Sequence, residues 1–141
     1  MLDFELAKAA SGGALNPDGT PAVSAFVFHL SNVAWHLGAA LLLLAVLTRL
    51  GAPRAVRAAV ALLYVVHPLH TEAVTYVSGR GDPMSAFFVL AALYLALSGG
   101  SPARRIACAL ASTACFAAGL LVKESAAIFP FLLLFVSLVR P

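Results

Sequence analysis

Long apolar stretches alternate with short polar ones along this chain, and the pattern predicts helices that cross a membrane. A helix needs roughly 20 apolar residues to span the hydrocarbon core of a bilayer. We expect an all-α, polytopic transmembrane helix bundle with five membrane segments, at residues 22–47, 54–66, 83–97, 103–122 and 125–139. The second, third and fifth segments are short for this task, so they require flanking residues or a locally thinner bilayer.

Capping residues mark the starts of three of these segments. Thr20-Pro21, Asp82-Pro83 and Ser101-Pro102 each place a side chain that can cap a helix in front of a proline. The side-chain oxygen accepts a hydrogen bond from an otherwise unpaired N–H, and proline suits the first helical position. Because proline disturbs a helix interior, we expect Pro130 to bend the fifth segment.

The composition also indicates a membrane protein. Of the 141 residues, 62% are hydrophobic and 11% are charged, whereas a soluble domain carries about 25% charged residues. The net charge is +3, but the basic residues lie between apolar segments, so topology explains them and we expect no nucleic-acid partner. Cys108 and Cys115 lie within an apolar segment and are interpreted as packing residues, not as a disulfide or a metal pair.

The distribution of basic residues predicts the orientation in the membrane. Short connections with more arginine and lysine face the cytoplasm. One side of the predicted segments carries six arginines, and the other side carries Lys8, Arg80 and Lys123. We therefore expect an external N-terminus, a cytoplasmic C-terminus, an external arm at residues 1–20 and an external loop at 67–82. The first residues are acidic where a signal peptide would be basic, so no cleavable signal is predicted.

The densest group of ionisable side chains lies in the loop at residues 67–82, HPLHTEAVTYVSGRGD. Pro68 prevents a regular helix through His67, so a turn is expected there. Such a turn could direct His67, His70 and Glu72 at one point. Two imidazoles and a carboxylate suit a divalent metal, or contacts to phosphate and sugar hydroxyls. The alternative is an interfacial turn whose polar groups only meet water and lipid headgroups.

Four further charged residues lie on the same predicted side. Arg80 could bind a lipid-linked phosphate through its guanidinium group, or it could extend to the headgroups. Asp82 is interpreted as a helix cap. Lys123 and Glu124 follow the fourth segment, where such a pair is usually a solvated helix end.

Polar residues also interrupt the first segment. His29, Asn32 and His36 are spaced to lie on one face of a helix. Polar groups inside membrane helices generally face protein or a water-filled cavity. We therefore expect interhelical hydrogen bonds, with His29 the closest of the three to the external side.

Three stretches of the sequence resemble one known family. HPLHTEAV at 67–74, followed by Ser78-Gly79-Arg80 and Asp82, resembles a block in the transmembrane and tetratricopeptide-repeat O-mannosyltransferases and their bacterial relatives. Two other stretches are similar to flanking parts of that family, namely residues 15–36 and the LVKES sequence at 121–125 with Pro130. The resemblance covers nearly the whole chain in the same order, and it implies a fragment of a GT-C fold glycosyltransferase.

The resemblance implies an activity and a set of binding residues. The family's membrane module transfers a sugar, here expected to be mannose-like, from a polyprenyl-phosphate donor to an acceptor hydroxyl on the external face. The implied partners are the lipid-linked donor, membrane lipids and a protein acceptor or partner chain, in a bacterial inner membrane. The implied substrate-binding residues are His67, His70, Glu72, Arg80, Asp82, Lys123 and Glu124, of which the first three are also candidate ligands of a divalent metal.

The family's acidic catalytic base and its repeats have no clear counterpart here. No catalytic residue is therefore assigned, and we expect part of a module. The alternatives are a non-catalytic polytopic membrane protein that binds lipid or metal, a transporter fragment, or a non-functional gene fragment. Transporters place polar residues near the bilayer midplane. Here the polar residues cluster at one interface, which favours lipid-phosphate chemistry over transport.

Overall fold

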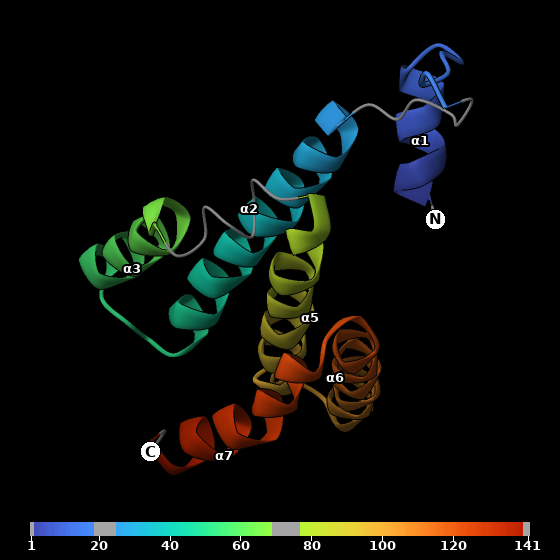
Figure 1. Cartoon of the computed structure of the whole chain (residues 1–141). Coiled ribbons are helices and arrows are strands. Elements are labelled where there is room, and N and C mark those ends of the chain that lie inside the picture. The colour runs from blue at the N-terminus through green and yellow to red at the C-terminus, as the bar shows by residue number, and fades with distance from the viewer. Residues whose placement is uncertain (1, 19–24, 69–76, 140–141) are drawn as a thin grey trace.

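A computed structural model describes residues 2–18, 25–68 and 77–139 (Figure 1). These residues form helices joined by short connections, and no strand is found in this part of the chain. The predicted all-α class is thus confirmed for the described residues. In chain order the helices are α1 (Leu2–Ala10), α2 (Ala25–Arg49), α3 (Arg54–Val66), the 3₁₀ turn η1 (Val77–Arg80), α5 (Gly81–Ala96), α6 (Pro102–Val122), the 3₁₀ turn η2 (Glu124–Ile128) and α7 (Phe129–Val139).

The predicted segments correspond to helices, but only some of these helices are long enough to span a bilayer. Helices α2, α3, α5 and α6 lie within a few residues of the first four predictions. Two stretches have the length and apolar composition to cross a membrane, Phe26–Arg49 and Pro102–Val122. The described structure therefore contains two candidate spans, together with shorter apolar helices at Gly81–Ala96 and Glu124–Val139.

The helix at the N-terminus was not predicted. Residues 1–20 were expected to form an arm, yet α1 occupies Leu2–Ala10 and buries Ala7. Its nine residues include three alanines, two leucines, one glutamate and one lysine, all of which favour helix. Lys8 lies in the last turn, where a positive charge is stabilised by the helix dipole. A search for spans of about 20 apolar residues misses a helix as short and as charged as this one.

The capping predictions had three different outcomes. Ser101 does cap α6, because its side chain accepts a hydrogen bond from the Arg104 N–H at 3.4 Å and Pro102 is the first helical residue. Asp82 does not cap α5, so that prediction is wrong: the turn η1 leads directly into a helix that begins at Gly81, with no side-chain cap. Asp82 therefore lies inside the first turn. Thr20-Pro21 lies outside the described residues.

The fifth predicted segment is divided in two. Residues 124–128 form the 3₁₀ turn η2, and the α-helical part begins at Phe129. Pro130 is thus in the first turn of α7, where its missing N–H leaves no helical hydrogen bond unmade. The interruption precedes the proline and does not lie within an otherwise continuous helix.

Helices α2 and α3 are antiparallel and share polar contacts. His36 Nε2 lies 3.4 Å from the Val65 carbonyl oxygen, and the His36 ring stacks on Tyr64 with 4.8 Å between the ring centres. At the other end of the pair, Arg57 donates a 2.8 Å hydrogen bond to the Thr48 hydroxyl. The predicted interhelical role is confirmed for His36.

Helix α5 lies between α2 and α6 (Figure 1). It runs parallel to α2, since Trp35 meets Phe87 at 5.1 Å between ring centres and Arg49 donates to the Leu97 carbonyl oxygen at 3.4 Å. It runs antiparallel to α6, since the buried Ser112 hydroxyl donates to the Ala92 carbonyl oxygen at 2.8 Å.

The hydrophobic core is formed by residues of α2, α5, η2 and α7. These residues are Val46, Val89, Ala92, Leu93, Ala126 and Phe129.

Gly119 allows α5, α6 and η2 to approach one another closely. A Cβ atom at this position would lie 3.3 Å from the Phe88 Cβ and 3.2 Å from the Ala126 Cβ. Both of these neighbouring atoms are next to the backbone and cannot rotate away. The two cysteines of α6, Cys108 and Cys115, are partly buried free thiols.

We predict that Gly119→Leu destabilises the fold far more than Ala117→Leu. The first substitution puts a branched side chain between packed helices, where overpacking typically costs about 1–3 kcal/mol. Ala117 is exposed on the same helix, so the matched substitution there adds bulk without a clash. Thermal unfolding in mild detergent provides the comparison. Equal melting temperatures for the two variants would show that α6 does not pack on α5 as described.

Candidate functional site

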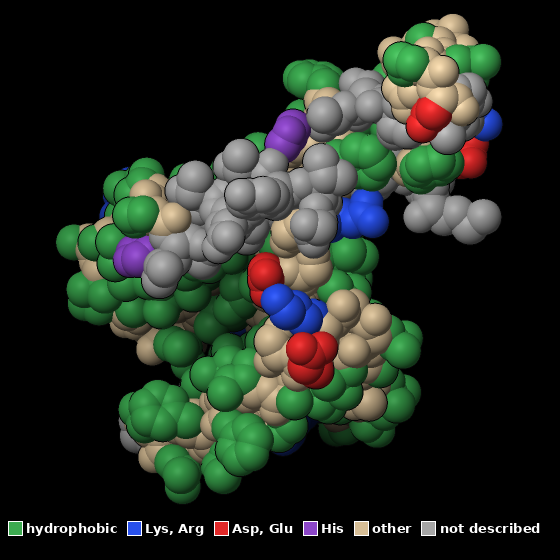
Figure 2. Space-filling model, in the orientation of Figure 1, with side chains coloured by type: hydrophobic (Ala, Val, Ile, Leu, Met, Phe, Trp, Pro, Cys, Tyr) green, Lys and Arg blue, Asp and Glu red, His purple; other side chains and the backbone are tan. Residues whose placement is uncertain are grey.

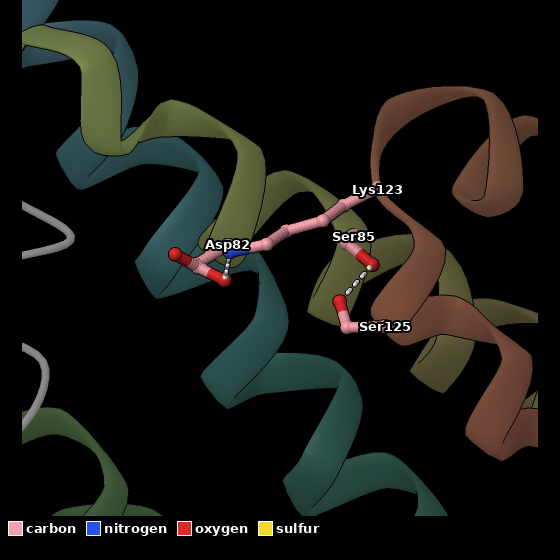
Figure 3. A network of polar contacts seen from close by, with 4 residues as sticks. All are labelled: Asp82, Ser85, Lys123 and Ser125. Carbon is pink, nitrogen blue, oxygen red and sulfur yellow. Dashed lines mark hydrogen bonds and ion pairs between the residues drawn. The ribbon is translucent and has the colours of Figure 1, made fainter.

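An ion pair joins the start of α5 to the end of α6. The Lys123 ammonium donates to Asp82 Oδ1 at 2.5 Å, across 41 residues of sequence (Figure 3). One turn along α5, the buried Ser85 hydroxyl lies 3.4 Å from the Ser125 hydroxyl of η2. We call Asp82, Ser85, Lys123 and Ser125 the Lys123 junction. It links two of the sequence stretches that carry the family resemblance.

The local backbone explains why Lys123 projects towards α5. Helix α6 ends at Val122, and Lys123 adopts an extended conformation with its N–H bonded to the Gly119 carbonyl oxygen at 2.9 Å. Its own carbonyl accepts from the Ala126 N–H at 3.1 Å and so begins η2. The lysine is therefore held between two helical elements, and the close contact at Gly119 keeps both of them against α5.

The charge of Lys123 is stabilised by its surroundings. The hydrogen bond with Asp82 raises the pKa of Lys123 above its ordinary value; desolvation opposes this rise, and the charges of Asp82 and Glu124 add to it. A group whose pKa is raised on folding contributes its full stabilisation below the unfolded pKa, about 10.4 for lysine. The contribution is lost only as the pH rises through the higher folded pKa. Lys123 thus keeps its positive charge throughout the physiological range.

Lys123 retains the capacity to bind a second anionic group. An ammonium group has three N–H donors, and the described contact with Asp82 uses one of them. The lysine side chain is 37% exposed and that of Asp82 is 53% exposed, so a ligand can reach both. Figure 2 shows acidic and basic side chains grouped side by side on a face that is otherwise largely hydrophobic.

Two of the predicted residues lie close to this junction along the chain. Arg80 directly precedes α5, two residues before Asp82, and is partly exposed. Glu124 follows Lys123 and is exposed. His67 ends α3 with an extended backbone. The structure therefore brings Asp82 and Lys123 into contact, and the chain places Arg80 and Glu124 next to them.

The candidate metal ligands are only partly described. His70 and Glu72 lie outside the described residues, so the predicted set of His67, His70 and Glu72 stays a prediction. Among the residues that are described, no group of three histidine, cysteine or acidic side chains is arranged to hold a metal ion. No chemical step is therefore assigned to a metal.

Sequence reasoning missed the two serines of the junction. Ser85 follows Asp82 by three residues, which places both on one face of α5. Ser125 follows Lys123 by two residues. This repeated pattern of a charge followed closely by a serine at both helix ends was the available signal, although it does not show by itself that the two ends meet.

We predict that the sign of the charges at Asp82 and Lys123 matters, not only their presence. Lys123→Asp places two carboxylates together and should lower the melting temperature, whereas Asp82→Lys combined with Lys123→Asp should recover most of the loss. Because both groups are partly exposed, the effect should be smaller than that of Gly119→Leu and should shrink at high salt. A double variant no more stable than the single one would contradict the pairing.

Comparison with known proteins supports part of the resemblance. A stretch of 65 residues is 43% identical to the mouse protein named Protein O-mannosyl-transferase TMTC3 and 40% identical to the human protein of that name. The stretch covers 46% of this chain and 7% of each relative. No family model matches the chain, and no solved structure does so either. The chain is thus similar over about half of its length to a small part of these O-mannosyl-transferases.

Proposed function

We propose that this chain forms part of the membrane module of a glycosyltransferase of the GT-C type. The similarity to the O-mannosyl-transferases over 65 residues carries the proposal. The donor would be a mannose-like sugar on polyprenyl phosphate, and the acceptor a hydroxyl on the external face of the membrane. The apolar helices α2 and α6, which are long enough to cross a bilayer, agree with a donor that is itself embedded in lipid.

The chemistry defines what the protein must supply. The acceptor oxygen attacks the anomeric carbon of the sugar, its proton passes to a base, and the bond from that carbon to the phosphate oxygen breaks. The polyprenyl phosphate leaves with additional negative charge, and cationic groups stabilise that charge in the transition state. Arg80 and Lys123 are suited to this role, since they lie at one end of α5 and α6 and are reachable from outside. No residue of this chain is assigned as the base.

The remaining residues of the candidate site have supporting roles in this proposal. Asp82 holds the Lys123 ammonium in place, and two further N–H donors of that ammonium would serve the donor phosphate. Glu124 could accept hydrogen bonds from sugar hydroxyls. His67, His70 and Glu72 would complete the site from the loop between α3 and α5, by contacts to the donor.

We predict that the purified chain in lipid nanodiscs binds mannosyl-phosphoryl-polyprenol through this end. Lys123→Gln, Arg80→Gln and His70→Ala should each weaken binding about tenfold, because a charge-assisted hydrogen bond contributes about 1.5–3 kcal/mol. Lys8→Gln is the matched control, since it removes one positive charge from an exposed position of α1. Titration with a fluorescent donor analogue gives the affinities.

Two results would overturn this proposal. One is the absence of binding by a chain whose helical circular dichroism shows that it is folded. The other is an equal loss of affinity in Lys8→Gln and Lys123→Gln, which would indicate attraction by net charge without a site.

A further inference from the structure

Five arginines lie at two reversals of the chain, between α2 and α3 and between α5 and α6. Both reversals are at the end of α5 opposite to the Lys123 junction. Arg49 ends α2, Arg54 begins α3 and Arg57 lies one turn later, while Arg104 and Arg105 lie in the first turn of α6. The two reversals are in direct contact, because Arg49 donates to the carbonyl oxygen of Leu97, which follows α5. We call these five residues the arginine end.

The positive charge of the arginine end is not balanced by carboxylates. The chain has six acidic residues, at positions 3, 5, 18, 72, 82 and 124. Those in the described part lie in or after α1 or beside Lys123, and α1 lies beyond the first residues of α2 (Figure 1). The arginine end therefore has five positive charges and no acidic side chain among the residues that the structure describes. At the opposite end Asp82 and Glu124 balance Arg80 and Lys123.

The five arginines divide into two groups by their contacts. Arg49 and Arg57 are partly buried and are held by neutral groups: the Arg49 guanidinium carbon lies 3.9 Å from the centre of the Tyr94 ring, and Arg57 bonds to Thr48. These contacts orient the helices without cancelling the charge. Arg54, Arg104 and Arg105 are exposed. Each offers a planar set of five N–H donors that matches the oxygens of a phosphate group.

We propose that the arginine end is a binding surface for the phosphate groups of anionic phospholipids. Arg54, Arg104 and Arg105 would contact the phosphates, and Arg49 and Arg57 would fix their positions. Helices α2 and α6, which are long enough to cross a bilayer, end or begin at this surface. The arginines therefore lie at the depth of the headgroups, where basic residues attract anionic lipids. This surface is separate from the Lys123 junction and does not depend on the proposed function.

The test uses the full chain in a neutral detergent. It is titrated with dioleoylphosphatidylglycerol, with dioleoylphosphatidylcholine and with inorganic phosphate, and native mass spectrometry measures the lipid retained. The triple variant Arg54→Gln, Arg104→Gln, Arg105→Gln is compared with the control Lys8→Gln, Ala9→Glu, Ala10→Glu, which changes exposed positions of α1. Each set lowers the net charge from +3 to 0, since +3 − 3 = 0. The two variants thus differ in where the charge is removed and not in how much.

The proposal predicts a preference for phosphatidylglycerol over phosphatidylcholine in the wild-type chain. The arginine variant should lose between about 10- and 100-fold in phosphatidylglycerol affinity, and the control variant should stay within about twofold of wild type. Replacing the same three arginines by lysine should keep most of the affinity, which shows that the glutamine variant did not simply unfold.

Three results would overturn the proposal. Equal losses in the arginine variant and in the control variant would show that only net charge matters. No preference between the two lipids would show that there is no anionic-lipid surface. Displacement of the lipid by inorganic phosphate at equal concentration would assign the arginines to a soluble anion.

Discussion

The close contact between α5 and α6 determines where the charged side chains of this molecule lie. Gly119 lets the two helices and η2 approach until a single added Cβ atom would be crowded, and Ser112 fixes their antiparallel alignment through the Ala92 carbonyl. In that alignment Lys123 meets Asp82 at one end, while Arg104 and Arg105 are left at the other. The separation of balanced and unbalanced charge is thus a consequence of helix packing.

The helices could be predicted largely from hydrophobic pattern and turn chemistry, because an apolar chain satisfies its backbone most simply as helix. The range 54–66 matched α3, and the cap at Ser101 was correct. The errors arose where local rules compete. Asp82 precedes a proline, as a helix cap often does. The turn η1 nevertheless continues into α5, and Asp82 lies inside the first turn of that helix. Helix α1 was missed because it is too short and too charged to resemble a membrane span.

The candidate site was predictable as a list of residues but not as an arrangement. The density of ionisable groups at 67–82 and the pair at 123–124 can be read from the sequence alone. The direct contact of Asp82 with Lys123 cannot, because it depends on the alignment of two helices whose ends are 41 residues apart. The same holds for Ser85 and Ser125, whose spacing from Asp82 and Lys123 does not by itself show that the two helix ends meet. These two uncharged side chains become part of the junction only once the fold has brought them together.

In the proposed function, the Lys123 end of the molecule receives the phosphate of a lipid-linked sugar. Photocrosslinking tests it most directly, with a polyprenyl-phosphate mannose that carries a diazirine beside the phosphate, incorporated in nanodiscs with the full chain. Peptide mapping should place the label on the segments that contain Arg80 and Lys123, and unlabelled donor should compete it away. Label confined to the segments around Arg54 and Arg104, or label that the unlabelled donor does not displace, would contradict the claim.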